Sequence, residues 1–261
     1  MNIDIALISK QGDRASNQDQ TGELIGQRSA CFLVCDGVAG FPGGEVAAKL
    51  ARNTILNRFN ADRHLNAQSI RGFIGEANQV ICRAQNETAE YSRMGTTLVG
   101  LFIDRDYELA WWVHAGDSRL YQFRRGCLRE VTADHSLIQQ MRDAGHSTEG
   151  INSNLLYYAL GMSEEVSGVT YSDVASIEDG DAFLLCTDGF WNGVTARQME
   201  QSLQMVNTPD EWLTLMRQII AGQPDDKQDN YSALAVWIGS PPDITLLHSL
   251  AGTAEFIPFR T

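Results

Sequence analysis

The stretch that decides the fold is residues 30–44, ACFLVCDGVAGFPGG, in which an apolar run leads directly into an aspartate and a glycine-rich turn. An uninterrupted apolar run of this length predicts a core strand. After the glycine pair at 43–44, apolar residues recur every four positions at 47, 51, 55 and 59, which predicts a helix. The local order is therefore a core strand, an Asp-Gly turn and a long helix.

The same two patterns recur along the rest of the chain. Further apolar runs of strand length lie at residues 97–103, 107–114, 182–186 and 231–238. Helical stripes lie at residues 70–84, 137–141, 199–206 and 212–219. Because strands come in adjacent groups and helices in pairs, we expect an α+β fold and not a doubly wound parallel sheet. The expected architecture is a four-layer αββα sandwich, with two central antiparallel β-sheets flanked by paired helices.

Length and composition indicate one large domain with a full hydrophobic core, since 43% of the 261 residues are hydrophobic. We expect this domain to cover residues 1–238. Residues 145–169 are the least regular part and are expected to form a surface loop or flap. Residues 239–261 carry three prolines and are expected to form a C-terminal extension.

The formal net charge of −13 would repel a nucleic-acid backbone, so no nucleic-acid partner is expected. A solvated acidic surface is the ordinary explanation for such a charge. No apolar run approaches the roughly 20 residues of a membrane span, and the first residues lack a basic region followed by an apolar stretch. We therefore expect a cytoplasmic protein with no membrane partner. The five cysteines include no CxxC pair and are expected to be reduced core residues.

Aspartates fall where the apolar runs end. Asp36, Asp117 and Asp188 each follow such a run, and Asp229 precedes one. For any single aspartate, a simple Asp-Gly turn is the better explanation. Four of them weaken that explanation, because carboxylates gathered beside a core repel each other and need a compensating positive charge.

The ligand types available at these strand ends favour a hard cation. All of the candidate donors are oxygens, and no cluster of histidines or thiolates has metal-ligand spacing, which points to Mg²⁺ or Mn²⁺ over zinc. A pair of such ions suits hydrolysis of a phosphate ester. Arg14 is placed to bind the phosphate through a bidentate contact. Arg119, in contrast, is expected to be an ion-pair partner.

Short motifs follow one another in a characteristic order. They are GDRASNQD at 12–19, VCDGVAGFPGGEVAA at 34–48, MGTTLVG at 94–100, HAGDSRLY at 114–121, LREVTADHS at 128–136, ALG at 159–161, LLCTDGFW at 184–191 and DN at 229–230. Through this ordered set the chain resembles the protein phosphatase 2C family, the metal-dependent serine/threonine protein phosphatases, in its compact bacterial form. The resemblance spans residues 1 to about 238.

The resemblance implies a β-sandwich flanked by paired helices, with two tightly bound ions at one end. Asp36 would bridge both ions, and the Gly37 carbonyl, Asp188 and Asp229 would complete the ligand set. Asp117 would help to hold a third, weaker ion. The flap at 145–169 would influence the choice of substrate.

The resemblance also implies roles for residues outside the ligand set. Asp19 would orient waters bound to the ions, and Arg14 would bind the substrate phosphate. The family signature at 134–136 has no evident chemical role, so we expect a structural one.

Three positions depart from the family pattern. Gln18 stands where many members have Glu, and this removes one carboxylate but leaves Asp19 in place. Val38 and Phe41 stand where eukaryotic and bacterial members, respectively, often carry a histidine. No protein side chain remains as an obvious acid for the leaving serine oxygen, so metal-bound water is the expected proton donor.

The expected function is metal-dependent dephosphorylation of phosphoserine and phosphothreonine in proteins. In signalling, this reaction would reverse phosphorylation by a Ser/Thr kinase. The substrate would be a phosphorylated protein, either a kinase or a kinase target. Two alternatives stay open. One is a phosphatase of the same fold that acts on a small phosphorylated molecule, and the other is an inactive member that binds phosphoproteins.

Overall fold

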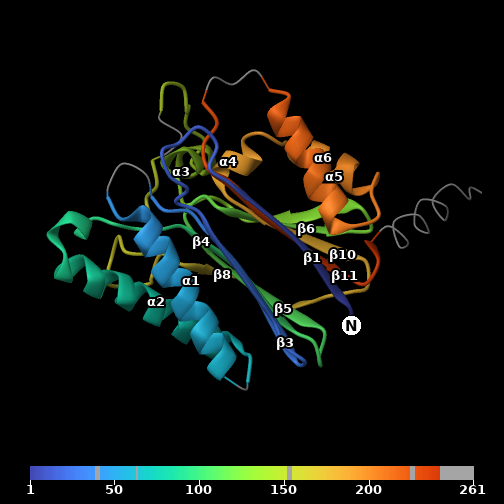
Figure 1. Cartoon of the computed structure of the whole chain (residues 1–261), viewed down its shortest axis with the longest axis horizontal. Coiled ribbons are helices and arrows are strands. Elements are labelled where there is room, and N and C mark those ends of the chain that lie inside the picture. The colour runs from blue at the N-terminus through green and yellow to red at the C-terminus, as the bar shows by residue number, and fades with distance from the viewer. Residues whose placement is uncertain (39–41, 63, 152–154, 224–226, 242–261) are drawn as a thin grey trace, which may run out of the picture.

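Two antiparallel β-sheets are stacked face to face, and helices cover the outer face of each sheet (Figure 1). The structure is a computed structural model that describes residues 1–38, 42–62, 64–151, 155–223 and 227–241. Helices α1 (Gly44–Ala61) and α2 (Ala67–Glu87) cover one side, and α5 (Ala196–Leu203) and α6 (Pro209–Ala221) cover the other. The expected αββα sandwich is confirmed.

The two sheets differ in which parts of the chain they use. Sheet A has the strand order β1 (Ile3–Lys10), β11 (Tyr231–Ile238), β10 (Asp181–Cys186), β6 (Arg119–Arg124) and β7 (Cys127–Val131). Sheet B has the order β2 (Gln20–Ile25), β3 (Ser29–Cys35), β4 (Leu98–Asp104), β5 (Leu109–Ala115) and β8 (Thr170–Tyr171), and β9 (Ala175–Ser176) also pairs with β5. Sheet A thus joins the start of the described chain to its end.

The central strands are continuous apolar runs because each is buried on both faces. In β3, Leu33 packs under α1 and α2, whereas its neighbours Phe32 and Val34 lie between the two sheets. Strands β10 and β11 alternate in the same way, with Leu184 under α5 and α6 and Leu185 between the sheets. Since successive side chains point to opposite faces of a strand, apolar layers on both sides require apolar residues at every position.

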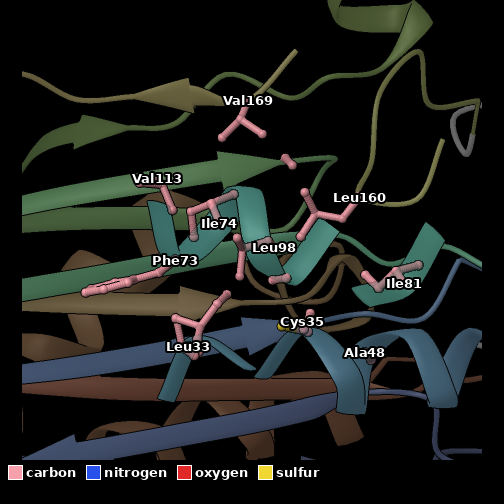
Figure 2. Close-up of a cluster of buried hydrophobic side chains, with 14 of the residues drawn as sticks. Leu33, Cys35, Ala48, Phe73, Ile74, Ile81, Leu98, Val113, Leu160 and Val169 are labelled. Carbon is pink, nitrogen blue, oxygen red and sulfur yellow. The ribbon is translucent and has the colours of Figure 1, made fainter. Parts of the chain in front are cut away.

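The helix stripes bury the residues that the four-residue spacing predicted. Figure 2 shows Ile74 and Ile81 of α2, together with Ala48 of α1, beside Leu33 and Leu98 of sheet B. Helix α2 begins at a capping box that links Asn66 and Ser69, which satisfies backbone N–H groups at its first turn. On the other side, α6 buries Trp212 completely against sheet A.

Three short helices connect these layers: α3 (Leu137–Asp143), α4 (Asp188–Trp191) and the 3₁₀ helix η1 (Ala89–Tyr91). Helix α4 starts at Asp188 itself, directly after β10. None of the described helices has the length and apolar composition that a membrane crossing requires.

The structure corrects some details of the sequence analysis. The run at 107–114 starts as a strand only at Leu109, because Glu108 has a positive φ of 54° and Tyr107 is 71% exposed in the preceding turn. Cys127 is exposed in β7 and is therefore not a core residue, whereas Cys31, Cys35 and Cys186 are buried.

The expected flap and extension fall only partly within the described residues. Residues 152–154 of the flap and 242–261 of the extension lie outside them. Within the flap, Tyr158, Ala159 and Leu160 are buried, and Leu160 packs in the core under α1 and α2. The middle of this segment is therefore anchored in the sandwich and is not a surface loop, whereas residues 162–165 are exposed.

Candidate metal centre

A pocket opens at the edge of the sandwich where β3, β5 and β10 end and β11 begins. Its described lining residues come from seven separate stretches of the chain and are Arg14, Ala15, Ser16, Gln18, Asp36, Gly37, Val38, Thr97, Asp117, Leu156, Asp188, Asp229 and Asn230. Antiparallel pairing explains the convergence, because the last residue of β10, Cys186, pairs with Arg119 at the start of β6. The strand-end aspartates therefore meet in one place, as the sequence pattern predicted.

The backbone of Asp36 is held by two threonines of the MGTT motif. The Asp36 N–H donates to Thr97 Oγ1 at 2.9 Å, and the Asp36 carbonyl accepts from Thr97 N at 2.8 Å and from Thr96 Oγ1 at 2.9 Å. Thr97 Oγ1 is in turn 2.7 Å from Ser118 Oγ, next to Asp117. These bonds leave the Asp36 side chain facing the pocket.

Gly37 lies against the first turn of α1. A Cβ atom on Gly37 would lie 2.4 Å from the carbonyl carbon of Gly44, so only glycine permits this approach. The Gly37 N–H donates to the Gln18 carbonyl at 3.2 Å. The contact joins the Asp-Gly turn, the start of α1 and the loop before β2.

Asp19 lies behind the pocket and is 3% exposed. Thr187 Oγ1 donates to Asp19 Oδ2 at 3.0 Å, and Thr187 Oγ1 accepts from Ser232 N at 2.9 Å. The other carboxylate oxygen, Oδ1, is buried and has no hydrogen-bond partner among the described residues. One oxygen of Asp19 is therefore available to a group that the protein itself does not supply.

Arg14 and Asp229 meet at the rim of the pocket. Arg14 Nη2 donates to Asp229 Oδ2 at 2.6 Å, and the two side chains are 51% and 35% exposed. Asn230 anchors the loop that carries Arg14, since its Nδ2 donates to the carbonyls of Gln11 and Ser16 at 2.6 and 2.9 Å. The guanidinium is thus placed at the pocket and accessible to solvent.

Asp117 lies in the turn after β5 and is 8% exposed. Trp191 Nε1 donates to the Asp117 carbonyl at 2.9 Å. The preceding Gly116 has a φ of 97°, and it exchanges two bonds with His135: its N–H donates to His135 Nδ1 at 3.2 Å, and its carbonyl accepts from His135 N at 2.9 Å. His135 therefore supports the turn that presents Asp117.

Arg119 is an ion-pair partner, as expected, and the signature at 134–136 makes contacts that support the fold. Arg119 donates to both carboxylate oxygens of Asp134 at 2.7 Å, and its guanidinium carbon lies 3.5 Å from the centre of the Trp191 ring. Ser136 caps α3 by accepting from Gln139 N. These contacts hold the walls of the pocket without facing into it.

The electrostatics of the pocket favour a bound positive charge. Loss of solvent and the neighbouring charges of Asp19 and Asp188 raise the pKa of Asp36 well above its ordinary value. Burial raises the pKa of Asp19 to about 6 and that of Asp117 to about 7, and burial followed by the charge of Asp229 raises the pKa of Asp188. Cations would remove this mutual repulsion.

The residues present fit hard divalent ions. The donors are carboxylate and carbonyl oxygens, and one buried oxygen of Asp19 lacks a partner. Among the described residues, no three His, Cys, Asp or Glu side chains are grouped as the ligands of a single ion. This spacing agrees with ions that take only some of their ligands from side chains and the rest from Gly37 and water, as Mg²⁺ commonly does.

All of the site residues expected from the sequence meet at this edge, with Asp19 behind Asp36. Sequence reasoning gave no role to Thr96, Thr97, Thr187 or Asn230, which hold the acidic residues and the Arg14 loop in place. Each of the four lies within a quoted motif, and Thr187 and Asn230 directly adjoin Asp188 and Asp229. Membership in these motifs was the signal that could have identified them.

An αββα sandwich with a carboxylate-lined pocket and an accessible arginine defines a metal-dependent hydrolase of phosphate esters. The sequence matches the family described as protein phosphatase 2C over residues 9–221, and the chain belongs to this family. This membership confirms the predicted enzyme class, a metal-dependent serine/threonine protein phosphatase that acts on phosphorylated proteins.

Known relatives agree with this assignment. The serine/threonine phosphatase stp of Listeria welshimeri is 30% identical over 203 residues, which cover 73% of this chain and 79% of the relative. The solved structure of the Mycobacterium tuberculosis serine/threonine phosphatase PstP/Ppp superposes with a TM-score of 0.78 at 25% identity, covering 91% of this chain and 99% of that one. A catalytic domain of PstP, solved with two manganese ions, shares the fold with a TM-score of 0.77 at 24% identity. The match covers 91% of this chain and 98% of that one.

Proposed function

We propose that Asp36, the Gly37 carbonyl, Asp188 and Asp229 hold two divalent cations, and that Arg14 binds the phosphate of a phosphoserine or phosphothreonine. The crowding of these carboxylates around one pocket, with a single accessible guanidinium at its rim, carries the proposal. When bound, the cations would lower the pKa of water and offset negative charge on the phosphoryl oxygens.

The protein's own residues would orient the reactants. Arg14 points from an exposed loop to the pocket, where its guanidinium would exchange Asp229 for phosphate oxygens or contact both. Asp19, fixed by Thr187, would accept hydrogen bonds from water through its unpartnered Oδ1. This geometry supports the water-orienting role that we propose for Asp19.

Proton transfer to the leaving oxygen would come from water. The described lining residues of the pocket include no His, Cys, Lys or Tyr side chain. Cys35 precedes Asp36 but is fully buried, and burial raises the pKa of its thiol to about 12. A thiolate nucleophile at this position is therefore unfavourable.

We further propose that Asp117 helps to hold a third, weaker ion, and that either Mn²⁺ or Mg²⁺ serves at the tight sites. Asp117 lines the same pocket but comes from a different turn than Asp36, Asp188 and Asp229. Asp117→Ala should keep two tight ions while lowering turnover. Calorimetric titration with Mn²⁺ checks this, and loss of the tight sites would place Asp117 among their ligands instead.

The wider assignments are also proposals. The phosphatase would oppose a Ser/Thr kinase in cytoplasmic signalling, and the five unpaired cysteines, all within the described residues, are consistent with a reducing compartment. The catalytic domain would cover residues 1–238, in agreement with the family match over 9–221. Residues 239–261 would form the extension.

The deciding experiment measures phosphate release from matched phosphoserine, phosphothreonine and phosphotyrosine peptides, each with Mn²⁺, with Mg²⁺ and with chelator. Metal-dependent release from the first two kinds of peptide supports the proposal. Release only from small phosphorylated metabolites would favour the alternative substrate class. Peptide binding with no release under any condition would indicate an inactive binding protein.

A further inference from the structure

A second cavity of about 480 Å³ lies beside the metal pocket, and residues of β5, β7, α3 and β8 line it. The two cavities share a wall made by residues 156–157 of the flap, in which Leu156 lines the metal pocket and Tyr157 lines the second cavity. This wall is fixed, since Tyr157 N donates to the His135 carbonyl at 2.9 Å. Leu156 and Tyr157 are consecutive residues, and the Cα atoms of consecutive residues are about 3.8 Å apart, so the two cavities are close neighbours.

The charges around the second cavity are negative and largely uncompensated. Its described lining residues include Glu130, Asp134 and Asp143 but no lysine or arginine. Asp134 is neutralised by Arg119. Glu130 and Asp143 are exposed and form no ion pair among the described residues, although one oxygen of Asp143 accepts from Gln139 Nε2.

A buried acceptor in the wall of the cavity also lacks a partner. Tyr171 lines the cavity, and its hydroxyl oxygen is buried with no hydrogen-bond partner among the described residues. His114, which also lines the cavity, is 4% exposed, and its Nε2 donates to the Ala133 carbonyl at 2.8 Å. Burial lowers the pKa of His114, and His135 is stacked on it at 4.5 Å. Because an unpaired buried acceptor is costly, this wall favours a ligand that carries N–H donors.

Apolar surface completes the cavity. Tyr157 is 51% exposed and Val131 is 42% exposed, and both line it. A long aliphatic stem could lie against Val131, and a cationic head could lie on the Tyr157 ring. The cavity thus combines an apolar entrance, two available carboxylates and one buried acceptor.

We propose that this cavity binds a basic side chain of the phosphoprotein substrate while the phosphorylated residue occupies the metal pocket. The inference rests on the proposed function. Arginine fits best, because its planar guanidinium offers several N–H donors and stacks on aromatic rings. Because the cavities are neighbours and an extended peptide advances about 3.3 Å per residue, the basic residue would lie within a few positions of the phosphorylated one.

The test uses phosphothreonine peptides that otherwise contain alanine, with one arginine moved stepwise along either side of the phosphothreonine. The measured quantity is the ratio of kcat/KM for each arginine peptide to kcat/KM for the all-alanine peptide. We expect a maximum of about three- to tenfold at one position, the size of a partly shielded ion pair. In the double variant Glu130→Gln, Asp143→Asn this maximum should fall to a ratio of about one.

A matched control is the double variant Glu23→Gln, Glu87→Gln, which removes the same charge from exposed positions on β2 and at the end of α2. It should keep the maximum. Equal ratios at every arginine position, or a maximum that survives in Glu130→Gln, Asp143→Asn, would overturn the cavity assignment, since the net charge of −13 attracts arginine at all positions alike. Failure of every phosphopeptide to release phosphate would instead refute the proposed function.

Discussion

The two ends of strand β10 carry aspartates in opposite electrostatic situations. At its start, Asp181 is completely buried and receives two bonds of 2.7 Å from Arg124. Directly after its end, Asp188 faces Asp36 and Asp229, and it forms no ion pair among the described residues. One strand therefore has a neutralised carboxylate as its first residue and an unneutralised one two residues beyond its last.

This difference separates structural from functional acid residues. Where a buried carboxylate only supports the fold, the chain provides an arginine for it, as Arg119 does for Asp134 and Arg124 for Asp181. At the candidate metal centre the described part of the chain leaves carboxylates without matching arginines, apart from the exposed Arg14. Unmatched buried charge is stable only when a ligand supplies the opposite charge.

The largest expected effect is that of Asp36→Asn. The change keeps the size of the side chain but removes the charge that would bridge the cations, so turnover should fall by orders of magnitude. Steady-state hydrolysis of a phosphothreonine peptide measures the loss, and circular dichroism should remain native. Cys35→Ser is the neighbouring control and should keep activity. The reverse pattern would refute the metal-centre assignment.

Asp181→Ala tests the other end of β10. Removing one partner of a buried pair should destabilise the protein by about 3 kcal/mol, the lower end for such pairs because Arg124 stays partly exposed and keeps Glu178. Urea unfolding measures this change. Turnover per folded molecule should stay close to that of the parent. A selective loss of metal binding would show that Asp181 also supports the metal site and would contradict the proposed difference between the two ends.

Arg14→Ala should act on catalysis and leave stability nearly unchanged. Loss of a charge-assisted phosphate contact costs about 1.5–3 kcal/mol, or about ten- to hundredfold in kcat/KM. The Arg14–Asp229 pair is exposed, so its loss should change the free energy of unfolding by less than about 1 kcal/mol. Kinetics and urea unfolding on the same preparation separate the two effects. Unchanged kcat/KM would remove Arg14 from the site.

The smallest expected effect is a pH dependence of metal-free stability. Burial raises the pKa of Asp19 to about 6 and that of Asp117 to about 7, so the folded state favours their protonated forms. Their contribution to stability is complete below about pH 4 and is lost as the pH rises through about 6 and 7. Thermal melts should therefore show a stabilisation by Mn²⁺ that grows by a few degrees from pH 5 to pH 8. If the stabilisation by Mn²⁺ were the same at pH 5 and pH 8, the raised pKa values of Asp19 and Asp117 would be contradicted.

Part of the fold followed from the sequence because central strands are apolar at every position. The runs that became β3, β10 and β11 were predicted for that reason. Strands β1, β2 and β6–β9 were missed. Strands β1 and β2 lie at sheet edges, where buried and exposed positions mix, as the 42% exposure of Leu7 in β1 illustrates, and the interior strand β6 (RLYQFR) is interrupted by polar residues. Their identity depends on partners that are distant in the chain, such as β11 for β1.

The sequence by itself determined the identity of the acidic residues at the strand ends, and with them the kind of ion that the site can accept, because ligand type sets that preference. Only the tertiary structure decided which groups hold them. Thr187 reaches Asp19 and Asn230 anchors the Arg14 loop across separations of more than 150 residues. The cavity behind Tyr157 likewise exists only where β5, β7, α3 and β8 meet. Contacts between distant segments depend on three-dimensional packing, and no local pattern encodes them.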